Sequence, residues 1–263
     1  MLIDTHCHLD DPTYQEDFDE LIARQKQSGV ERIIVPGVNA KSLISVPAVC
    51  GKYPGYLYPA LGLHPEEVKE DYLEELDKIH TALSQEQWIA VGEIGLDYHF
   101  DKTFQKEQLF SFRQQLRWAA EKNIPVIIHS RDATSDCLKL LREIVDASSE
   151  TSTMHRIRGV VHCFSGSREV AEQITAMGFY LGIGGVITFK NAKLAEVLQH
   201  VSPDNLLLET DGPYLAPVPF RGKRNESCYM HYVVKELANV YHCSTEEIEL
   251  RTTKNAIDLF FAS

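Results

Sequence analysis

The chain has 263 residues, 44% of them hydrophobic, and is long enough to bury a sizeable core. With 24% charged residues, 15 glycines and 11 prolines, its composition is that of a globular protein and excludes collagen-like or largely disordered chains. The 38 acidic and 26 basic side chains give a formal net charge of -12. This charge argues against a protein that binds nucleic acid through a broad basic surface, so an anionic substrate would need a local cation.

The cysteines and the N-terminus indicate a cytoplasmic protein. The six cysteines form no CxxC pair, and the segment from Met1 to Cys7 lacks the basic and apolar regions of a secretion signal. The chain also lacks an apolar run of roughly 18 to 20 residues, which a membrane span requires. We therefore expect reduced thiols, no membrane association and no obligate protein partner.

Short apolar runs alternate along the chain with stretches of helical period, a pattern typical of a parallel sheet covered by helices. Eight runs are predicted as strands: Leu2 to His6, Arg32 to Pro36, Tyr56 to Leu61, Trp88 to Gly92, Pro125 to Ile128, Gly159 to His162, Phe179 to Ile183 and Leu206 to Glu209. Helices are predicted at Glu16 to Ser28, Asp71 to Ser84, Thr103 to Asn123, Thr134 to Ala147, Arg168 to Met177, Ala192 to His200, Ser227 to Tyr241 and Ser244 to Phe261.

Eight strand-helix repeats predict the α/β fold class and, within it, a (β/α)8 TIM barrel. An open doubly wound sheet normally uses about five or six strands. The polar patch Ser148 to Thr153 is interpreted as a surface loop, so we expect a single metal-dependent hydrolase barrel domain over residues 1–263. Functional residues of such barrels lie at the C-terminal ends of the strands.

Metal-competent side chains lie at or just past the ends of five of the predicted strands. Because side chains alternate along a strand, His6 and His8 project from the same face. Helix capping or an ordinary buried histidine would explain any single one of these residues. Together they would crowd one barrel mouth without a partner, at a cost of several kcal/mol of desolvation, so a metal site is predicted. The set is His6, His8, Glu93, His129, His162 and Asp211.

Six ligands exceed the roughly three that a single catalytic zinc-type centre takes from its protein, which favours two divalent cations. Glu93 has two oxygens and lies between the other ligands in strand order, so it is the natural bridge. Two dications with two carboxylates leave a positive excess that attracts a phosphodiester or a developing oxyanion. Mixed imidazole and carboxylate ligation suits zinc, manganese or cobalt better than magnesium, and the choice among the four stays open.

Six motifs, in this order, resemble the signatures of the TatD family of metal-dependent deoxyribonucleases. They are Asp4 to Leu9, Gly62 to Pro65, Gly92 to Asp97, Pro125 to Arg131, His162 to Gly166 and Leu208 to Leu215, with Phe220 to Glu226 as a further similar segment. The resemblance implies an amidohydrolase-type barrel, two divalent metals and hydrolysis of DNA phosphodiesters, often from the 3′ end. It also implies the assignment of ligands. His6, His8, Glu93 and Asp211 would bind one metal, while the shared Glu93, His129 and His162 would bind the second.

Other residues are candidates for contact with substrate. His64 follows the third strand and either contacts substrate, protonates a leaving group or only hydrogen-bonds its loop. Arg221 and Arg224, with Lys223, form a compact basic cluster after the last strand, and either bind phosphate or belong to a solvated surface. Arg131 binds substrate or forms a structural ion pair.

Asp4 and Glu209 lie two positions from His6 and Asp211 and share their strand faces. We expect them to accept hydrogen bonds that orient the metal ligands.

The leading hypothesis is a phosphodiesterase that acts on DNA as a 3′-5′ exodeoxyribonuclease, with single strands or 3′ ends as substrate. In it Asp211 accepts a proton from the attacking water. The alternative is an amidohydrolase-like deacylase that cleaves an ester or amide, including a tRNA-linked ester. A metal-binding protein without catalysis is disfavoured, because Asp211 completes a ligand set with a base.

Overall fold

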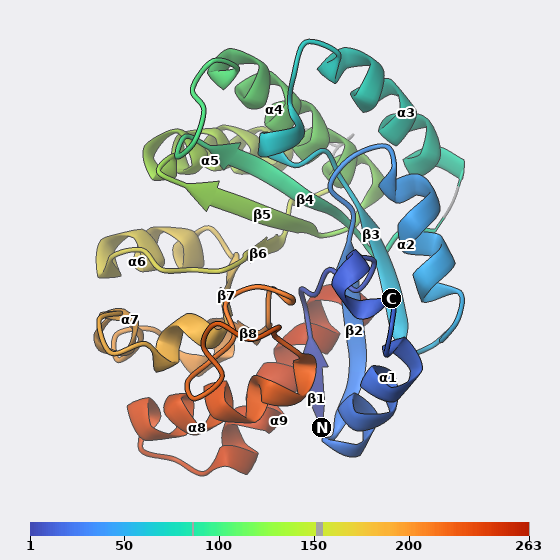
Figure 1. Cartoon of the computed structure of the whole chain (residues 1–263). Helices are drawn as coiled ribbons and strands as arrows, with labels where there is room; N and C mark the ends of the chain where they lie inside the picture. The colour runs from blue at the N-terminus through green and yellow to red at the C-terminus, as the bar shows by residue number, and fades with distance from the viewer. Residues whose placement is uncertain (86, 151–154, 263) are drawn as a thin grey trace.

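The computed structural model describes residues 1–85, 87–150 and 155–262, and within them eight parallel strands form one sheet in the order β1 to β8. Helices surround this ring of strands (Figure 1). The predicted TIM barrel is confirmed. The strands are β1 (Leu2–Asp4), β2 (Val30–Pro36), β3 (Leu57–Leu61), β4 (Ala90–Asp97), β5 (Val126–Arg131), β6 (Gly159–Val161), β7 (Tyr180–Ile183) and β8 (Leu206–Leu208).

The helices are α1 (Phe18–Gln27), α2 (Ser42–Cys50), α3 (Tyr72–Gln85), α4 (Gln105–Lys122), α5 (Thr134–Glu150), α6 (Arg168–Ala176), α7 (Leu194–Leu198), α8 (Met230–Tyr241) and α9 (Thr245–Ala256). Helix α2 was not predicted, because its apolar residues are not confined to one face and Pro47 lies inside it. Helix α5 extends through Glu150, which corrects the start of the predicted loop Ser148 to Thr153. Residues 151–153 of that loop lie outside the described residues.

Backbone contacts between the segments that follow β1 and β8 bring the two ends of the sheet together. The amide of Thr5 donates to the carbonyl of Leu208 at 3.0 Å, and the amide of Asp211 donates to the carbonyl of His6 at 2.9 Å. The amide of His8 donates to the carbonyl of Gly212 at 2.8 Å. The closure of the barrel therefore sets His6, His8 and Asp211 side by side.

Asp4 stabilises this closure from inside the molecule. Its buried carboxylate accepts hydrogen bonds from the amides of His6 and Thr210 at 3.2 and 3.0 Å. It also accepts from the hydroxyls of Thr210 and Ser227, each at 2.7 Å. Asp4 thus bonds to the backbone of His6 and of Thr210, which are a predicted ligand and the neighbour of another.

The C-terminal segment packs against one end of the barrel interior. Arg32, near the start of β2, lies with its guanidinium carbon 4.3 Å from the centre of the Phe261 ring, so this is the end where strands begin. The apolar cluster there consists of Ile3, Ile34, Ala60, Ala90, Ile127, Val160, Leu207, Ala256, Leu259 and Phe260. The C-terminal ends of the strands are left for the functional site.

Within the described part of the chain, no helix combines the length and the apolar character that crossing a membrane requires.

Replacing Asp4 by Ala removes four hydrogen bonds to a buried carboxylate and leaves buried donors unpaired. We expect the free energy of unfolding to fall by about 2 to 4 kcal/mol. Urea denaturation of the chelator-treated protein, followed by circular dichroism, measures the change. Asp258→Ala is the matched control, because it removes only an exposed ion pair with Lys254 and costs under about 1 kcal/mol. Equal losses in the two variants would contradict the role given to Asp4.

Candidate metal centre

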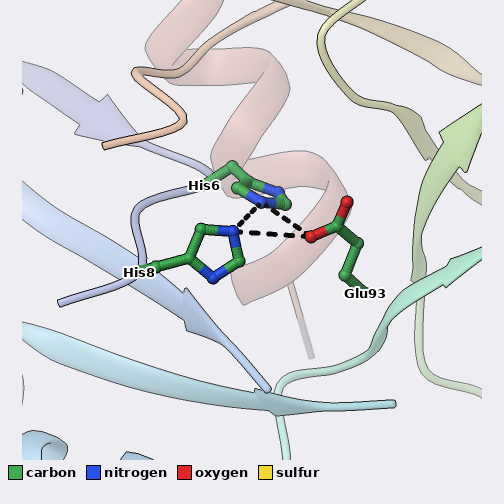
Figure 2. Close-up of side chains that lie close together, drawn as sticks. All are labelled: His6, His8 and Glu93. Carbon is green, nitrogen blue, oxygen red and sulfur yellow. Dashed lines mark hydrogen bonds and ion pairs between the residues drawn. The ribbon is translucent and has the colours of Figure 1, made fainter. Parts of the chain in front are cut away.

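One oxygen of Glu93 faces the two histidines that follow β1 (Figure 2). Glu93 Oε2 lies 3.2 Å from His6 Nε2 and 3.5 Å from His8 Nε2. Asp211 Oδ1 lies 3.7 Å from the same nitrogen of each ring. Asp211 adopts a left-handed conformation with φ of 57°, which Asp tolerates better than most residues. The structure thus brings together the residues predicted as ligands of the first metal.

The other oxygen of Glu93 faces three more histidines. Oε1 lies 2.7 Å from His162 Nε2, 3.0 Å from His129 Nδ1 and 3.3 Å from His64 Nε2. His129 is in β5, His162 follows β6 and His64 follows β3. The two oxygens of one buried carboxylate therefore face two sets of nitrogens, as those of a bridging ligand would. We call the following residues the Glu93 cluster: Glu93, Asp211, His6, His8, His64, His129 and His162.

The chemistry of these donors fits divalent cations. Nε2 of His6 and Nε2 of His8 are 3.1 Å apart, and His129 Nδ1 is 3.2 Å from His162 Nε2. A neutral imidazole has one proton, so nitrogens this close to one another and to a carboxylate cannot all be satisfied by hydrogen bonds. Cations would engage the lone pairs and the carboxylate together. Within the described residues, three groups could hold an ion: His6, His8 and Glu93; His6, His162 and Asp211; and His64, Glu93 and His129.

The electrostatics of the site keep Glu93 ionised and His6 unprotonated, while His162 holds a proton that a cation would displace. Burial alone would raise the pKa of Glu93, but the surrounding imidazoles hold it well below its usual range. Burial, together with repulsion from His162, lowers the pKa of His6 to about 3, so His6 keeps its lone pairs. Burial disfavours a proton on His162, yet the charge of Glu93 outweighs it and raises the pKa of His162 to about 10. The Glu93 carboxylate thus attracts positive charge to this position.

Asp97 orients His129, a role that the sequence analysis missed. Its Oδ2 lies 2.8 Å from Nε2 of His129, so a proton on Nε2 leaves the Nδ1 lone pair directed at Glu93. Gly95, with φ of 146°, lets β4 approach the carbonyl of His129 more closely than a Cβ atom would permit. Asp97 lies beyond the predicted strand end at Gly92, but its distance of four positions from Glu93 on an extended strand was a signal that both share a face.

Glu209 contacts the segment that carries His162. Its Oε1 accepts a hydrogen bond from the amide of Cys163 and lies 3.8 Å from His162 Nδ1. Burial raises the pKa of Glu209 to about 8. Glu209 thus positions the backbone beside His162.

Two of the arginines predicted to bind substrate are exposed and lie over aromatic rings. The guanidinium carbon of Arg131 is 4.7 Å from the centre of the Phe100 ring, and that of Arg221 is 4.0 Å from the centre of the Phe189 ring. Cation-π contacts of this kind leave guanidinium N–H groups at the ring edges, where they can still donate to phosphate.

Arg224, the third arginine predicted to bind substrate, is hydrogen-bonded to carboxylates of the protein. Nη1 donates to the carbonyl of Thr13 and to Asp17 Oδ1, each at 2.7 Å. Nη2 donates to Asp17 Oδ2 and Glu226 Oε1, each at 2.8 Å. These bonds favour a structural ion pair over the predicted phosphate contact, because both terminal nitrogens of the guanidinium already bind carboxylates.

Comparison with known proteins identifies the family. The model of the family described as TatD related DNase matches residues 3–261. The chain is 42% identical, over 99% of both chains, to a protein of Bacillus subtilis named uncharacterized metal-dependent hydrolase YabD. It is 32% identical to the 3′-5′ ssDNA/RNA exonuclease TatD of Pectobacterium carotovorum, over 90% of each chain.

Among solved structures, the TatD homolog YjjV of Escherichia coli superposes with a TM-score of 0.90 at 32% identity, over 100% of this chain and 98% of that one. The family model spans residues 3–261, and each of these relatives covers nine-tenths or more of the chain. The chain therefore belongs to the TatD family of metal-dependent hydrolases.

Proposed function

We propose that the protein hydrolyses DNA phosphodiester bonds as a 3′-5′ exonuclease on single strands, using two divalent cations that share Glu93. The observation that carries this proposal is the division of the two Glu93 oxygens between two sets of nitrogens. When bound, the cations would supply Lewis acidity that lowers the pKa of water and stabilises charge developing on the phosphate. The exonuclease name of the Pectobacterium relative supports the choice of substrate.

The ligand set also supports an anionic substrate. In the proposed assignment, His6, His8 and Asp211 hold one cation, while His129 and His162 hold the other. Glu93 and Asp211 contribute two negative charges, which leave a local positive excess beside two dications. This excess would draw a phosphodiester to a protein whose formal net charge is -12.

Asp211 is proposed as the base. Burial raises its pKa, which makes its carboxylate a better proton acceptor than an exposed aspartate. Its side chain is 17% exposed, whereas that of Glu93 is 3% exposed, so Asp211 is the more accessible carboxylate. The proton of the attacking water would move to a carboxylate oxygen of Asp211.

His64 is proposed to contact substrate by donating a hydrogen bond from Nε2 to the leaving oxygen, with its proton retained. Its Nδ1 accepts a hydrogen bond from the amide of Glu66 at 3.2 Å, which places the ring proton on Nε2. Nε2 is the atom that lies 3.3 Å from Glu93 Oε1, inside the cluster. The loop contact considered in the sequence analysis is thus present, and it directs the proton of His64 toward the site.

The first test is hydrolysis by purified protein. We expect cleavage of 5′-labelled single-stranded DNA from its 3′ end, loss of cleavage after chelation, and recovery with manganese, cobalt, zinc or magnesium to different extents. Gel analysis of the products gives polarity, and circular dichroism checks that the chelated protein stays folded. Full activity after verified metal removal would overturn the proposal, as would hydrolysis of an ester and amide panel, including aminoacyl-tRNA, without any cleavage of DNA.

Asp97→Ala should weaken metal binding, because His129 loses the partner that orients it. We expect an affinity roughly 10- to 100-fold lower for one of two cations, measured by competition with a fluorescent chelator. Asp132→Ala is the matched control. It removes an equally short 2.8 Å contact, to His99, but the two side chains are exposed and outside the cluster. Equal metal affinities of both variants would show that Asp97 does not support the site.

Asp211→Asn should slow turnover more than it weakens DNA binding. Asn keeps an oxygen for the cation but cannot accept the proton, and loss of a general base costs on the order of 10² to 10⁴ in rate. The measurement is kcat at saturating metal, with occupancy determined by mass spectrometry. A fully occupied variant with near-normal kcat would give the role of base to another group.

A further inference from the structure

We propose that Phe100 and Tyr214 stack on the two nucleobases that flank the scissile phosphate, one ring on each side of the metal centre. This inference rests on the proposed nuclease function and deepens it, because it names the residues that would bind a single strand. Such stacking depends on where the two rings lie and on how exposed they are. The two rings must lie on opposite sides of the site, close to it, and free to accept a base.

The barrel topology places the rings on opposite sides. Phe100 follows β4 and Tyr214 follows β8. In a ring of strands ordered β1 to β8, these two strands are half the ring apart (Figure 1). Glu93 lies within β4, and its two oxygens contact histidines of the cluster. A strand that crosses the mouth from one ring to the other would pass over this cluster.

Tyr214 lies beside a histidine of the cluster, and Phe100 shares a cavity with a residue that contacts another. The ring centres of Tyr214 and His8 are 6.4 Å apart, in an edge-to-face arrangement. On the other side, Phe100 lines a cavity of about 280 Å³ together with Asp97, the residue that binds His129. Phe104 and Lys69 line the same cavity. A base on either ring would therefore place its sugar and phosphate near the proposed cations.

Both rings are exposed, and the backbone of Tyr214 is held by hydrogen bonds. Phe100 is 73% exposed and Tyr214 is 56% exposed. The amide of Tyr214 donates to the carbonyl of Asp211 at 2.9 Å, and its carbonyl accepts from the side chain of Asn225 at 2.8 Å. Asn225 itself is buried, with 1% exposure. The backbone of Tyr214 is thus held while its ring is exposed. Because the backbone is already ordered, less conformational entropy is lost when a base stacks on the ring.

The surroundings of Phe100 include elements that bind a single strand. Arg131 lies over one face of the ring, and the His99 ring packs edge to face with it at 4.6 Å. The cavity wall beside Phe100 carries Lys69 together with the acidic Glu66, Asp97 and Asp101. Aromatic faces with adjacent cations are the elements by which proteins hold single strands, through base stacking and phosphate contacts. A paired duplex offers no free base face to these rings. The arrangement therefore selects unpaired ends and tolerates any base, since every base has a stacking face.

The test combines ring removal with base removal. Tyr214→Leu and Phe100→Leu keep an apolar side chain but lose the aromatic face. The substrates are labelled single-stranded oligonucleotides, either intact or with one abasic residue on the 5′ or the 3′ side of the first bond cleaved. We expect each variant to lower kcat/KM on the intact strand by roughly 5- to 100-fold. Phe110→Leu, at a ring on α4 that is 42% exposed, is the matched control and keeps the wild-type value.

The decisive result is the coupling between ring and base. In the wild-type protein, an abasic residue on either side should slow cleavage. In Tyr214→Leu, the abasic residue on one side should cause no additional loss, and in Phe100→Leu the same should hold for the other side. Strictly multiplicative losses, or variants that match Phe110→Leu, would overturn the inference while DNA cleavage by the wild-type protein upholds the proposed function. A wild-type protein that cleaves no DNA would overturn both.

Discussion

A buried carboxylate surrounded by imidazoles is the constraint on which the rest of the site depends. Glu93 lies in the interior of the barrel with five histidine nitrogens within 3.5 Å of its oxygens, counted over the described residues. A buried charge without compensation costs several kcal/mol, and the imidazoles compensate it only if protons or cations are shared among them. In a family of metal-dependent hydrolases, cations are the compensation that also supplies chemistry.

The same residues serve both the closure of the barrel and the site. The hydrogen bonds that join the segments after β1 and β8 run through the backbones of His6, His8 and Asp211. The carboxylate of Asp4 accepts hydrogen bonds from the amides of His6 and Thr210 and so connects the two segments. The proposed ligands are therefore held in place by main-chain hydrogen bonds, which gives the preorganisation that electrostatic catalysis requires.

The arginine side chains near the site fall into two groups with different contacts. Arg224 and Arg24 bind the carboxylates of Asp17 and Glu226, and so join the start of α1 to the segment before α8. Arg131 and Arg221 instead lie over the exposed ring of Phe100 and the partly buried ring of Phe189. In the proposed function, Arg131 and Arg221 are the two of these four arginines that would donate N–H groups to a phosphate.

The sequence by itself determined the barrel and the members of the Glu93 cluster. Alternating apolar runs and helical stretches report burial on strands and helices directly, and residues just past a parallel strand must meet at one edge of the sheet. Only the tertiary structure decided which oxygen of Glu93 faces which histidine, that Asp97 binds His129, and that Arg224 is held by Asp17. Those outcomes depend on distances between side chains far apart in sequence. A local pattern of hydrophobicity contains no information on such distances, since many pairings satisfy the same pattern.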